Sequence, residues 1–348
     1  MTQSSAAVFR HPDPTRLIAF WRDDLAAYEM EVQDDAPGVL TAQAGPLCLR
    51  MQADADACRI EIACEDAAQL PDYRTWLSGR MAAFDAALPP LAWTGAETAG
   101  ALPPSLAVGE VAGSAPFGAS WWRMDVALSA EGYDRFAGDD HWHFRLLRAS
   151  SRRRAPVWPR LDANGVIRWP EGDDRPSDRV FTVRDHDPKA RTITFDIYRH
   201  PGGPTCDWAA TRPLGQTVGI MGPGAKTGPE AAGGGGRLIV GGDETSAPAI
   251  LRALSRLPEK TPVDVVLLAG ASADINEVPE PRITWLLREN GATEATLLAA
   301  LRARLVGADP GTRLWFAASQ SGAREIKAVA LEQAKLNKRD VHAVSFWL

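Results

Sequence analysis

Three side chains with binding chemistry lie close together in residues 179–187, RVFTVRDHD: Arg179, Phe181 and Thr182. In an extended strand, Arg179 and Phe181 would lie on one face and Thr182 on the other. A guanidinium fork binds anionic oxygens, a flat ring stacks on planar groups, and a hydroxyl forms hydrogen bonds. Together they could hold one ligand that has a flat part and an anionic part. They also suit an ordinary exposed barrel strand, because Val, Phe and Thr favour strands.

A basic run lies just before this strand. On a chain with a formal net charge of -6, a local basic cleft could attract an anionic substrate. The alternative is a solvated loop. The run RLLRASSRRR supplies Arg145, Arg148, Arg152, Arg153 and Arg154.

The metal-binding residue types do not form a recognisable site. His141 and His143 would share one strand face, but no third ligand is evident beside them. The four cysteines are scattered without a CxxC pair, which argues against structural zinc and iron–sulfur clusters and fits a reducing compartment. We therefore predict no metal site.

Length and composition limit the class of protein. A chain of 348 residues is long enough for two or three domains. The net charge of -6 argues against nucleic-acid binding as the main role. The sequence has no apolar run long enough to span a membrane, and its first residues lack the pattern of a secretory signal. We expect a cytoplasmic protein without stable membrane association.

The element patterns predict a multidomain chain with three segments. Residues 1–95 predict an α+β module, with a helix that begins after Asp13, a small sheet, and a helix over residues 69–88. Residues 110–228 contain many short strands with Gly and Pro turns, which is typical of an antiparallel β-barrel. Residues 237–348 alternate strands with helices, which predicts a Rossmann-like α/β domain with a parallel sheet.

Several motifs occur in a fixed order along residues 115–348: HFRLL, RVFTVRDHDP, FDIYRH with GGPTCDWA, GDETSAPAI, ITWLLR and SFWL. In these motifs the chain resembles the siderophore-interacting proteins, which are flavin-dependent ferric-siderophore reductases of the ferredoxin–NADP reductase superfamily. The N-terminal module is similar to a small uncharacterised domain fused ahead of some of these reductases.

The resemblance implies a function and partners. Residues 110–228 would bind FAD, and residues 237–348 would form an NAD(P)H-binding-like domain. Electrons would pass from NADPH, NADH or a ferredoxin through FAD to a ferric siderophore, which would release Fe(II). Two alternatives stay open: a flavin reductase or diaphorase with another acceptor, and a non-catalytic siderophore-binding protein.

The resemblance also assigns roles within the flavin motif. Arg179 would bind the FAD pyrophosphate, and Phe181, where the family has Tyr, would stack on the isoalloxazine. Thr182 would form a hydrogen bond near flavin N5, which makes it the candidate catalytic residue. The pyrimidine side of the ring would be lined by Ile197, Tyr198 and His200.

Further roles follow for the next motif. Gly203 would let the backbone approach a phosphate closely. The family's Ser falls on Cys206, with a hydroxyl one place earlier at Thr205, so which of the two contacts phosphate is open. Trp208 would pack against the turn or the adenine end.

The C-terminal domain carries one match and one departure. In GDETSAPAI, Gly242, Asp243 and Thr245 would lie where the nicotinamide approaches the flavin. A structural alternative is a tight turn followed by helix caps. In the last strand-to-helix turn, Ala318 and Ser319 replace the Gly and Glu that are common in the family. That turn would bind the donor, so the choice among NADH, NADPH and a ferredoxin stays open.

Overall fold

The computed structural model describes residues 3–27, 30–36, 38–44, 46–96, 99–138, 142–224, 228–230, 236–278, 280–309 and 311–347. The chain forms two compact units, each of two segments. One unit joins Met1–Ala107 with Leu147–Ser177, and the other joins Val108–Leu146 with Asp178–Leu348. The domain limits 1–95, 110–228 and 237–348 stay predictions.

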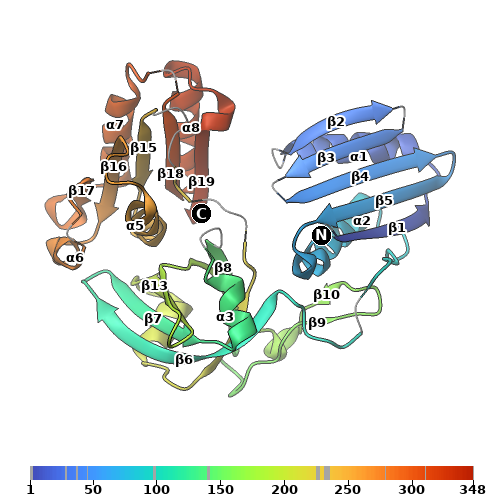
Figure 1. Ribbon diagram of the computed structural model, residues 1–348, viewed down its shortest axis with the longest axis horizontal. Coiled ribbons are helices and arrows are strands. Elements are labelled where there is room, and N and C mark those ends of the chain that lie inside the picture. The colour runs from blue at the N-terminus through green and yellow to red at the C-terminus, as the bar shows by residue number, and fades with distance from the viewer. Residues whose placement is uncertain are drawn as a thin grey trace. The chain divides into compact units, whose positions relative to one another are not determined.

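The first unit contains a five-stranded antiparallel sheet in the order β1-β5-β4-β3-β2. Two helices, α1 (Pro14–Ala27) and α2 (Leu70–Phe84), cover one face of this sheet (Figure 1). A short 3-10 helix (Ala67–Gln69) precedes α2. The strands are β1 (Gln3–Arg10), β2 (Glu31–Ala36), β3 (Val39–Ala44), β4 (Leu47–Asp54) and β5 (Ala57–Cys64).

The local sequence explains this α+β module. Buried and exposed side chains alternate along β4, because one face of the sheet packs on the helices. Asp13 caps α1 as predicted, since its Oδ1 accepts a hydrogen bond from the Arg16 backbone at 2.9 Å. The predicted helix, sheet and second helix are confirmed. Strand β1 was not predicted, because QSSAAVFR lacks a clear alternation of polar and apolar residues.

A hairpin from the second segment completes the core of this unit. Its strands are β9 (Arg160–Leu161) and β10 (Ile167–Arg168), and a 3-10 helix (Gly172–Asp174) follows them. Val166 is only 4% exposed and belongs to the core of the α+β module. The Ile167 amide donates to Thr75 Oγ1 on α2 at 2.8 Å. The hairpin is therefore a structural part of the N-terminal module.

The second unit contains the predicted antiparallel, barrel-like sheet, in the order β11-β8-β14-β6-β7-β13-β12. Its outer strands β11 and β12 are joined by Val183 and Arg184, whose amides donate to Trp142 O at 2.9 Å and Thr194 O at 2.7 Å. The connection is thus hydrogen-bonded to the residue before β8 and to β13, which lie near opposite edges of the sheet. The elements are β6 (Leu106–Phe117), β7 (Trp121–Ala127), α3 (Ala130–Phe136), β8 (His143–Arg148), β11 (Ser177–Thr182), β12 (Asp185–Asp187), β13 (Thr192–Tyr198), α4 (Pro204–Ala210) and β14 (Thr217–Met221).

The rest of this unit is the predicted α/β domain with a parallel sheet, in the order β17-β16-β15-β18-β19. Its strands are β15 (Leu238–Gly242), β16 (Val263–Ala269), β17 (Ile283–Leu287), β18 (Arg313–Ser319) and β19 (Val341–Trp347). Its helices are α5 (Ala247–Arg256), α6 (Ser272–Glu277), α7 (Glu294–Leu305) and α8 (Gln320–Ala328), with 3-10 turns Arg288–Asn290 and Lys338–Asp340 and a π-helical turn Val329–Gln333.

The helices of this domain cover opposite faces of its sheet. Helix α5 packs in one core cluster, and α7 and α8 pack in the other. The helices that follow β15 and β18 therefore diverge where these neighbouring strands end. Such a point is where open α/β sheets bind ligands.

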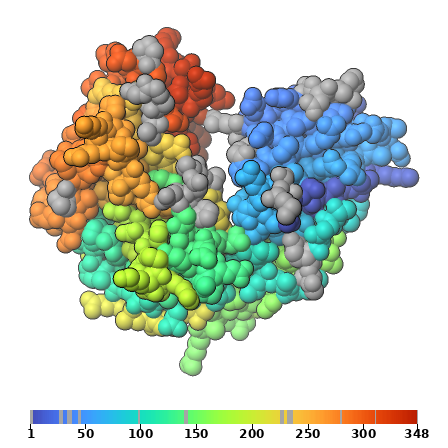
Figure 2. Space-filling view, viewed as in Figure 1, coloured from blue at the N-terminus to red at the C-terminus, as the bar shows by residue number. Residues whose placement is uncertain are grey.

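The barrel and the α/β domain lie against each other within one unit (Figure 2). Asp274 is fully buried and accepts hydrogen bonds from the backbone of Ala119 at 2.7 Å and of Ser120 at 3.0 Å. Arg252, also fully buried, donates to Val183 O at 2.7 Å. These contacts fix the relative position of the two sheets. No helix among the described residues has the length and apolar character needed to cross a membrane.

Candidate functional site

Strand β11 carries the three side chains of the flavin-like motif. Arg179 is exposed, and its Nη1 donates to Asp178 O at 2.8 Å. Phe181 is half-buried and lies 5.3 Å from the ring of Phe195, measured between centroids. Thr182 is 5% exposed. The strand therefore presents an accessible cation and a partly accessible ring, next to a buried hydroxyl.

The end of β13 brings a second pair of rings together. Tyr198 is half-buried and stacks on the exposed ring of His200, with centroids 5.9 Å apart and planes at 29°. Burial raises the pKa of the Tyr198 phenol, and the Glu244 carboxylate raises it further. Ile197 is only 2% exposed, so its side chain belongs to the barrel core.

Helix α4 begins directly beside these rings. A Cβ on Gly203 would lie 2.6 Å from the ring of the exposed His200 and 3.0 Å from Cys206 Sγ, so a larger residue here would displace the His200 ring. Cys206 Sγ donates to Tyr198 O at 2.9 Å, which ties the helix to β13. The Cys206 thiol thus forms a hydrogen bond within the protein.

The two remaining residues of this motif lie on the same helix. Thr205 is 7% exposed. Trp208 is half-buried, and its Nε1 donates to Gln216 Oε1 at 2.9 Å. This hydrogen bond connects α4 to the turn that follows it. Contacts of Thr205, Cys206 and Trp208 with a cofactor stay predictions.

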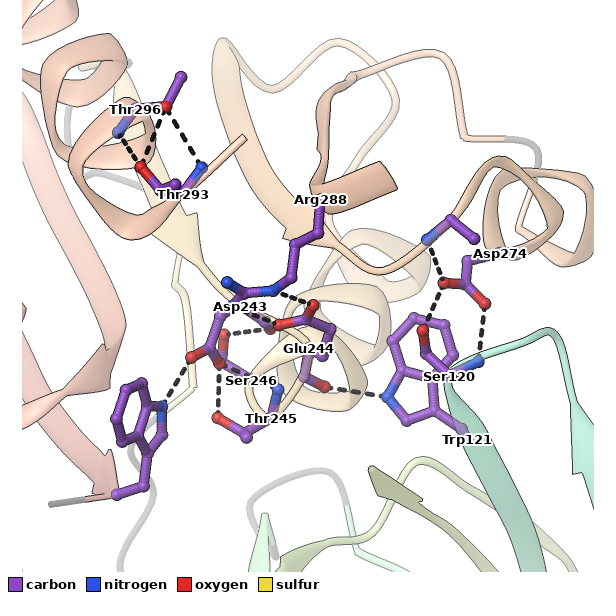
Figure 3. Close-up of polar contacts among 12 residues, drawn as sticks. Ser120, Trp121, Asp243, Glu244, Thr245, Ser246, Asp274, Arg288, Thr293 and Thr296 are labelled. Atoms are coloured by element: carbon purple, nitrogen blue, oxygen red, sulfur yellow. Dashed lines mark hydrogen bonds and ion pairs between the residues drawn. The ribbon is translucent and has the colours of Figure 1, made fainter. Parts of the chain in front are cut away.

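The loop after β15 is organised by Asp243. Its Oδ1 accepts hydrogen bonds from the Thr245 backbone at 2.9 Å and the Thr245 hydroxyl at 2.6 Å, which forms an Asx turn (Figure 3). The N-cap residue of α5 is Ser246, so neither Asp243 nor Thr245 caps that helix. A tight turn is present, because the Ser246 amide donates to Asp243 O at 3.0 Å, and a Cβ on Gly242 would collide with Ser246 Oγ.

The C-terminal strand reaches this same loop. Trp347 Nε1 donates to Asp243 Oδ2 at 2.7 Å. Since β19 is separated from β15 by β18, this contact crosses the carboxyl end of β18. Trp347 itself is 43% exposed. Its indole therefore lies beside the point where the helices diverge.

Glu244 connects three elements at the same edge. Its side chain is 1% exposed and forms two hydrogen bonds with Arg288, from Nε at 2.6 Å and from Nη2 at 3.0 Å (Figure 3). Its backbone oxygen accepts a hydrogen bond from Trp121 Nε1 of the barrel at 2.9 Å. Because a buried carboxylate needs such a partner, Arg288 explains how Glu244 can be buried.

The turn that departs from the family pattern contains a carboxylate from another element. Ser319 caps α8, and its Oγ donates to Glu294 Oε1 on α7 at 2.6 Å. The Gly322 amide donates to Ser319 Oγ at 2.9 Å. A carboxylate is therefore present at this turn although Ser319 stands where the family has Glu.

Nearby acids offset most of the basic run. Arg145 pairs with Asp178, and Arg153 pairs with Asp174. Arg152 Nη1 lies 3.3 Å from Asp173 Oδ1. Such exposed pairs are weak, but each carboxylate cancels one positive charge.

The other two arginines of the run differ in exposure. Arg148 is 8% exposed and donates to Ser177 Oγ at 3.1 Å. Arg154 is exposed, and no described residue forms an ion pair with it. A substrate role of the whole run stays a prediction.

The described residues contain no group of three or more His, Cys, Asp or Glu side chains that could hold a metal ion. His141 of the HWH motif lies outside the described residues. His143 is described, and its Nδ1 lies 3.2 Å from Thr182 Oγ1. The sequence favoured strand packing or a siderophore contact for His143 over a metal pair, and it gave no signal for this contact with Thr182.

Two family models match this chain. Residues 123–227 match the Siderophore-interacting FAD-binding domain, and residues 236–348 match the Siderophore-interacting protein. Together the matches cover more than half of the chain and lie on the segments that carry the motifs. Residues 1–122 lie outside both matches.

Two curated relatives share part of this sequence. The mycobactin import ATP-binding/permease protein IrtA of Mycolicibacterium thermoresistibile is 28% identical over 189 residues, which are 51% of this chain and 20% of that relative. The chain thus spans about a fifth of that relative's length. The ferric vibriobactin reductase ViuB of Vibrio cholerae is 24% identical over 234 residues, which are 64% of this chain and 83% of that relative.

A solved structure has a similar fold. The siderophore utilization protein from T. fusca aligns with a TM-score of 0.58 and 25% sequence identity. The alignment covers 72% of this chain and 95% of that one.

Proposed function

We propose that this chain, which belongs to the siderophore-interacting protein family, uses FAD to reduce Fe(III) that is bound to a siderophore. One observation carries the proposal. Within the segment that matches the family's FAD-binding domain, strand β11 presents Arg179, Phe181 and Thr182 in succession. The exposed guanidinium, the flat ring and the buried hydroxyl suit a ligand with an anionic part and a planar part.

The chemistry of these side chains fits FAD. Arg179 has a single hydrogen bond, to Asp178 O, among the described residues, so most of its donors are available for a pyrophosphate. The hydroxyl of Thr182 has one partner in the described part of the chain, His143. The stacked pair of Tyr198 and His200 adds a flat surface at the end of β13. These features suit different parts of a flavin dinucleotide: its anionic pyrophosphate, its flat ring and the hydrogen-bonding edge of that ring.

The role of the protein in this reaction is positioning and electrostatics. When bound, FAD supplies redox chemistry that accepts two electrons and passes them on singly. Arg179 holds the anionic part, Phe181 and Tyr198 border the ring, and Thr182 offers a hydrogen bond to its edge. The contacts of Asp274 and Arg252 hold the α/β domain against the barrel.

A ferric siderophore is the proposed substrate. Fe(III) would arrive in its chelator, and Fe(II) would leave because it binds hard oxygen ligands less well. Protein ligands for iron are then unnecessary. The substrate of the related ViuB, by its name ferric vibriobactin, supports this substrate class. Acidic residues offset part of the positive charge of the basic run. An anionic chelator is therefore expected to contact an arginine such as Arg154, which forms no ion pair with a described residue.

The electron donor is proposed to approach the loop around Asp243. This loop lies where the helices after β15 and β18 diverge, a usual place for nucleotides in such sheets. NADH, NADPH and a reduced ferredoxin are the donors to compare. Glu294 beside Ser319 puts a negative charge at this edge, which opposes the extra phosphate of NADPH. NADH is therefore expected to be the better of the two nucleotides.

A steady-state assay tests the proposed function. The purified, FAD-loaded protein is supplied with each donor and a ferric siderophore, and Fe(II) is trapped with a chelating dye. We expect faster turnover with the ferric siderophore than with simple dye acceptors. Equal turnover with dyes alone would favour a general flavin reductase. A protein that binds the siderophore but reduces nothing with any donor would be a binding protein.

A further inference from the structure

The contact between His143 and Thr182 joins two strands of the barrel. His143 Nδ1 on β8 and Thr182 Oγ1 on β11 lie 3.2 Å apart. Thr182 is 5% exposed, and the described residues offer its hydroxyl no second partner. A hydroxyl can donate one hydrogen bond and accept others. Which of the two groups donates decides what Thr182 can offer to a ligand.

The surroundings of His143 keep its ring neutral. Burial, together with the nearby Arg252 and His342, lowers the pKa of His143 to about 4. On the side of Nε2, the buried nitrogen has no hydrogen-bond partner in the described part of the chain. The ring of Phe346 contacts the imidazole edge-on, with centroids 5.9 Å apart. One ring nitrogen therefore carries a proton and the other does not.

The proton belongs on Nδ1. A proton on Nε2 would be a buried N–H donor without an acceptor, which is rare in proteins. A proton on Nδ1 finds the oxygen of Thr182, and the bare Nε2 needs only apolar neighbours. In this tautomer Thr182 Oγ1 accepts, so its own O–H is free to donate.

We propose that His143 is a positioning residue that donates from Nδ1 to Thr182 and thereby turns the Thr182 hydroxyl into a donor toward an acceptor atom of the flavin ring. The inference deepens the proposed function and rests on it for the identity of the ligand. The opposite tautomer would make Thr182 donate to His143. Its hydroxyl proton would then be unavailable to the ligand.

A direct test determines the tautomer of His143 in the 348-residue chain without ligand. Nitrogen-15 NMR of labelled histidine distinguishes a protonated Nδ1 from a protonated Nε2 near pH 7. Each of the six histidines is assigned by replacing it singly, with H143N identifying the signal of interest. We expect His143 to carry its proton on Nδ1. A proton on Nε2 would overturn the proposal, and this measurement on the wild type does not depend on how a variant folds.

A second test measures the bound cofactor in variants of His143 and Thr182. The amide of Asn reaches about as far as Nδ1 and can donate, whereas Leu cannot. H143L and T182V are each expected to weaken FAD binding about fivefold to tenfold and to shift the visible flavin spectrum in the same way. H143N should bind FAD within about twofold of the wild-type affinity and should show the wild-type flavin spectrum. Because the two residues act through one hydrogen bond, H143L/T182V should be no worse than the stronger single variant.

The outcomes separate this inference from the proposed function. If the wild type binds no FAD, the proposed function fails, while the tautomer result still reports on His143. If the wild type binds FAD and H143L has the wild-type affinity and spectrum, the positioning role is overturned. Additive effects of H143L and T182V would overturn it as well.

Discussion

Asp274 Oδ2 accepts a hydrogen bond from Ser120 Oγ at 2.6 Å, although the two residues are 154 positions apart in the chain. Its other oxygen accepts the backbone amides of Ala119 and Ser120. Gly118, beside them, has a positive φ of 57°, and a Cβ there would lie 2.6 Å from Asp274 Oδ1. One buried carboxylate thus anchors the β6–β7 turn of the barrel to the start of α6.

Asp274→Ala should destabilise the second unit. The change leaves the buried amide and hydroxyl of Ser120 without their acceptor, and the partly buried amide contact of Ala119 is lost as well, so we expect a loss of about 3 kcal/mol in the free energy of unfolding. Urea unfolding measures this. Asp134→Ala is the matched control, because Asp134 is an exposed helical residue of the same unit. A change as small as that of the control would show that the anchor contributes little.

Val166→Ala should weaken the first unit, although Val166 lies far from the α+β module in sequence. Loss of its buried methyl groups is expected to reduce stability by about 2 kcal/mol. Val157, in the same segment but 39% exposed, supplies the control Val157→Ala. Peptide-resolved hydrogen exchange should show faster exchange in β1–β5 and α2 for Val166→Ala only. Unchanged protection there would mean that the hairpin does not support the module.

Much of the fold was predictable from the sequence, for local reasons. The buried strands of the α/β domain are short apolar runs between helices, and Asp13 lies directly before an amphipathic helix. The placement of the hairpin was not predictable. Val166 lies in a short segment, LDANGVIRWP, whose apolar residues do not indicate which element they pack against, and only the folded chain shows that Val166 packs beside α2.

The candidate site was predictable only in part, because its contacts are long-range. The motif residues of β11 were identified, but Thr182 meets His143 across 39 positions and Asp243 meets Trp347 across 104. Glu244 was inside a recognised motif without an assigned partner, since nothing in the sequence pairs it with Arg288. The acids that offset Arg145 and Arg153 become visible only when the strands and turns are placed.

Arg179→Ala should weaken FAD binding by about 10-fold to 100-fold, because a guanidinium–phosphate contact contributes about 1.5–3 kcal/mol. Phe181→Tyr should keep FAD, since the ring face is retained. Lys189→Ala controls for the loss of one positive charge, as Lys189 lies in an exposed turn of the same barrel. Quenching of FAD fluorescence gives the affinities. Wild-type affinity in Arg179→Ala would contradict the assignment of this strand to the pyrophosphate.

The free energy of unfolding should decrease as the pH is lowered, over a pH range that His143 determines. The pKa of its ring is lowered from 6.5 to about 4 in the folded protein. The unfolded chain therefore binds a proton as pH drops below about 6.5, while the folded form stays neutral until about pH 4. Through this group the wild type should lose about 2 kcal/mol between about pH 7.5 and 5. Arg252 and His342 are the groups of neighbouring elements that oppose the charge.

His143→Asn is the comparison for this pH dependence, because the amide does not titrate. Urea unfolding at the two pH values should give a smaller loss for the variant than for the wild type. The same loss in both proteins would show that His143 titrates near its ordinary pKa in the folded state.

Anaerobic spectroscopy of a single turnover tests the central proposal most directly. The FAD-loaded protein is reduced with each donor in turn and then mixed with a ferric siderophore while the flavin absorbance is followed. We predict that the oxidised flavin spectrum returns on mixing and that Fe(II) appears in an amount that matches the electrons lost. A protein that binds no FAD, or a reduced flavin that stays reduced in the presence of the ferric siderophore, would contradict the proposal.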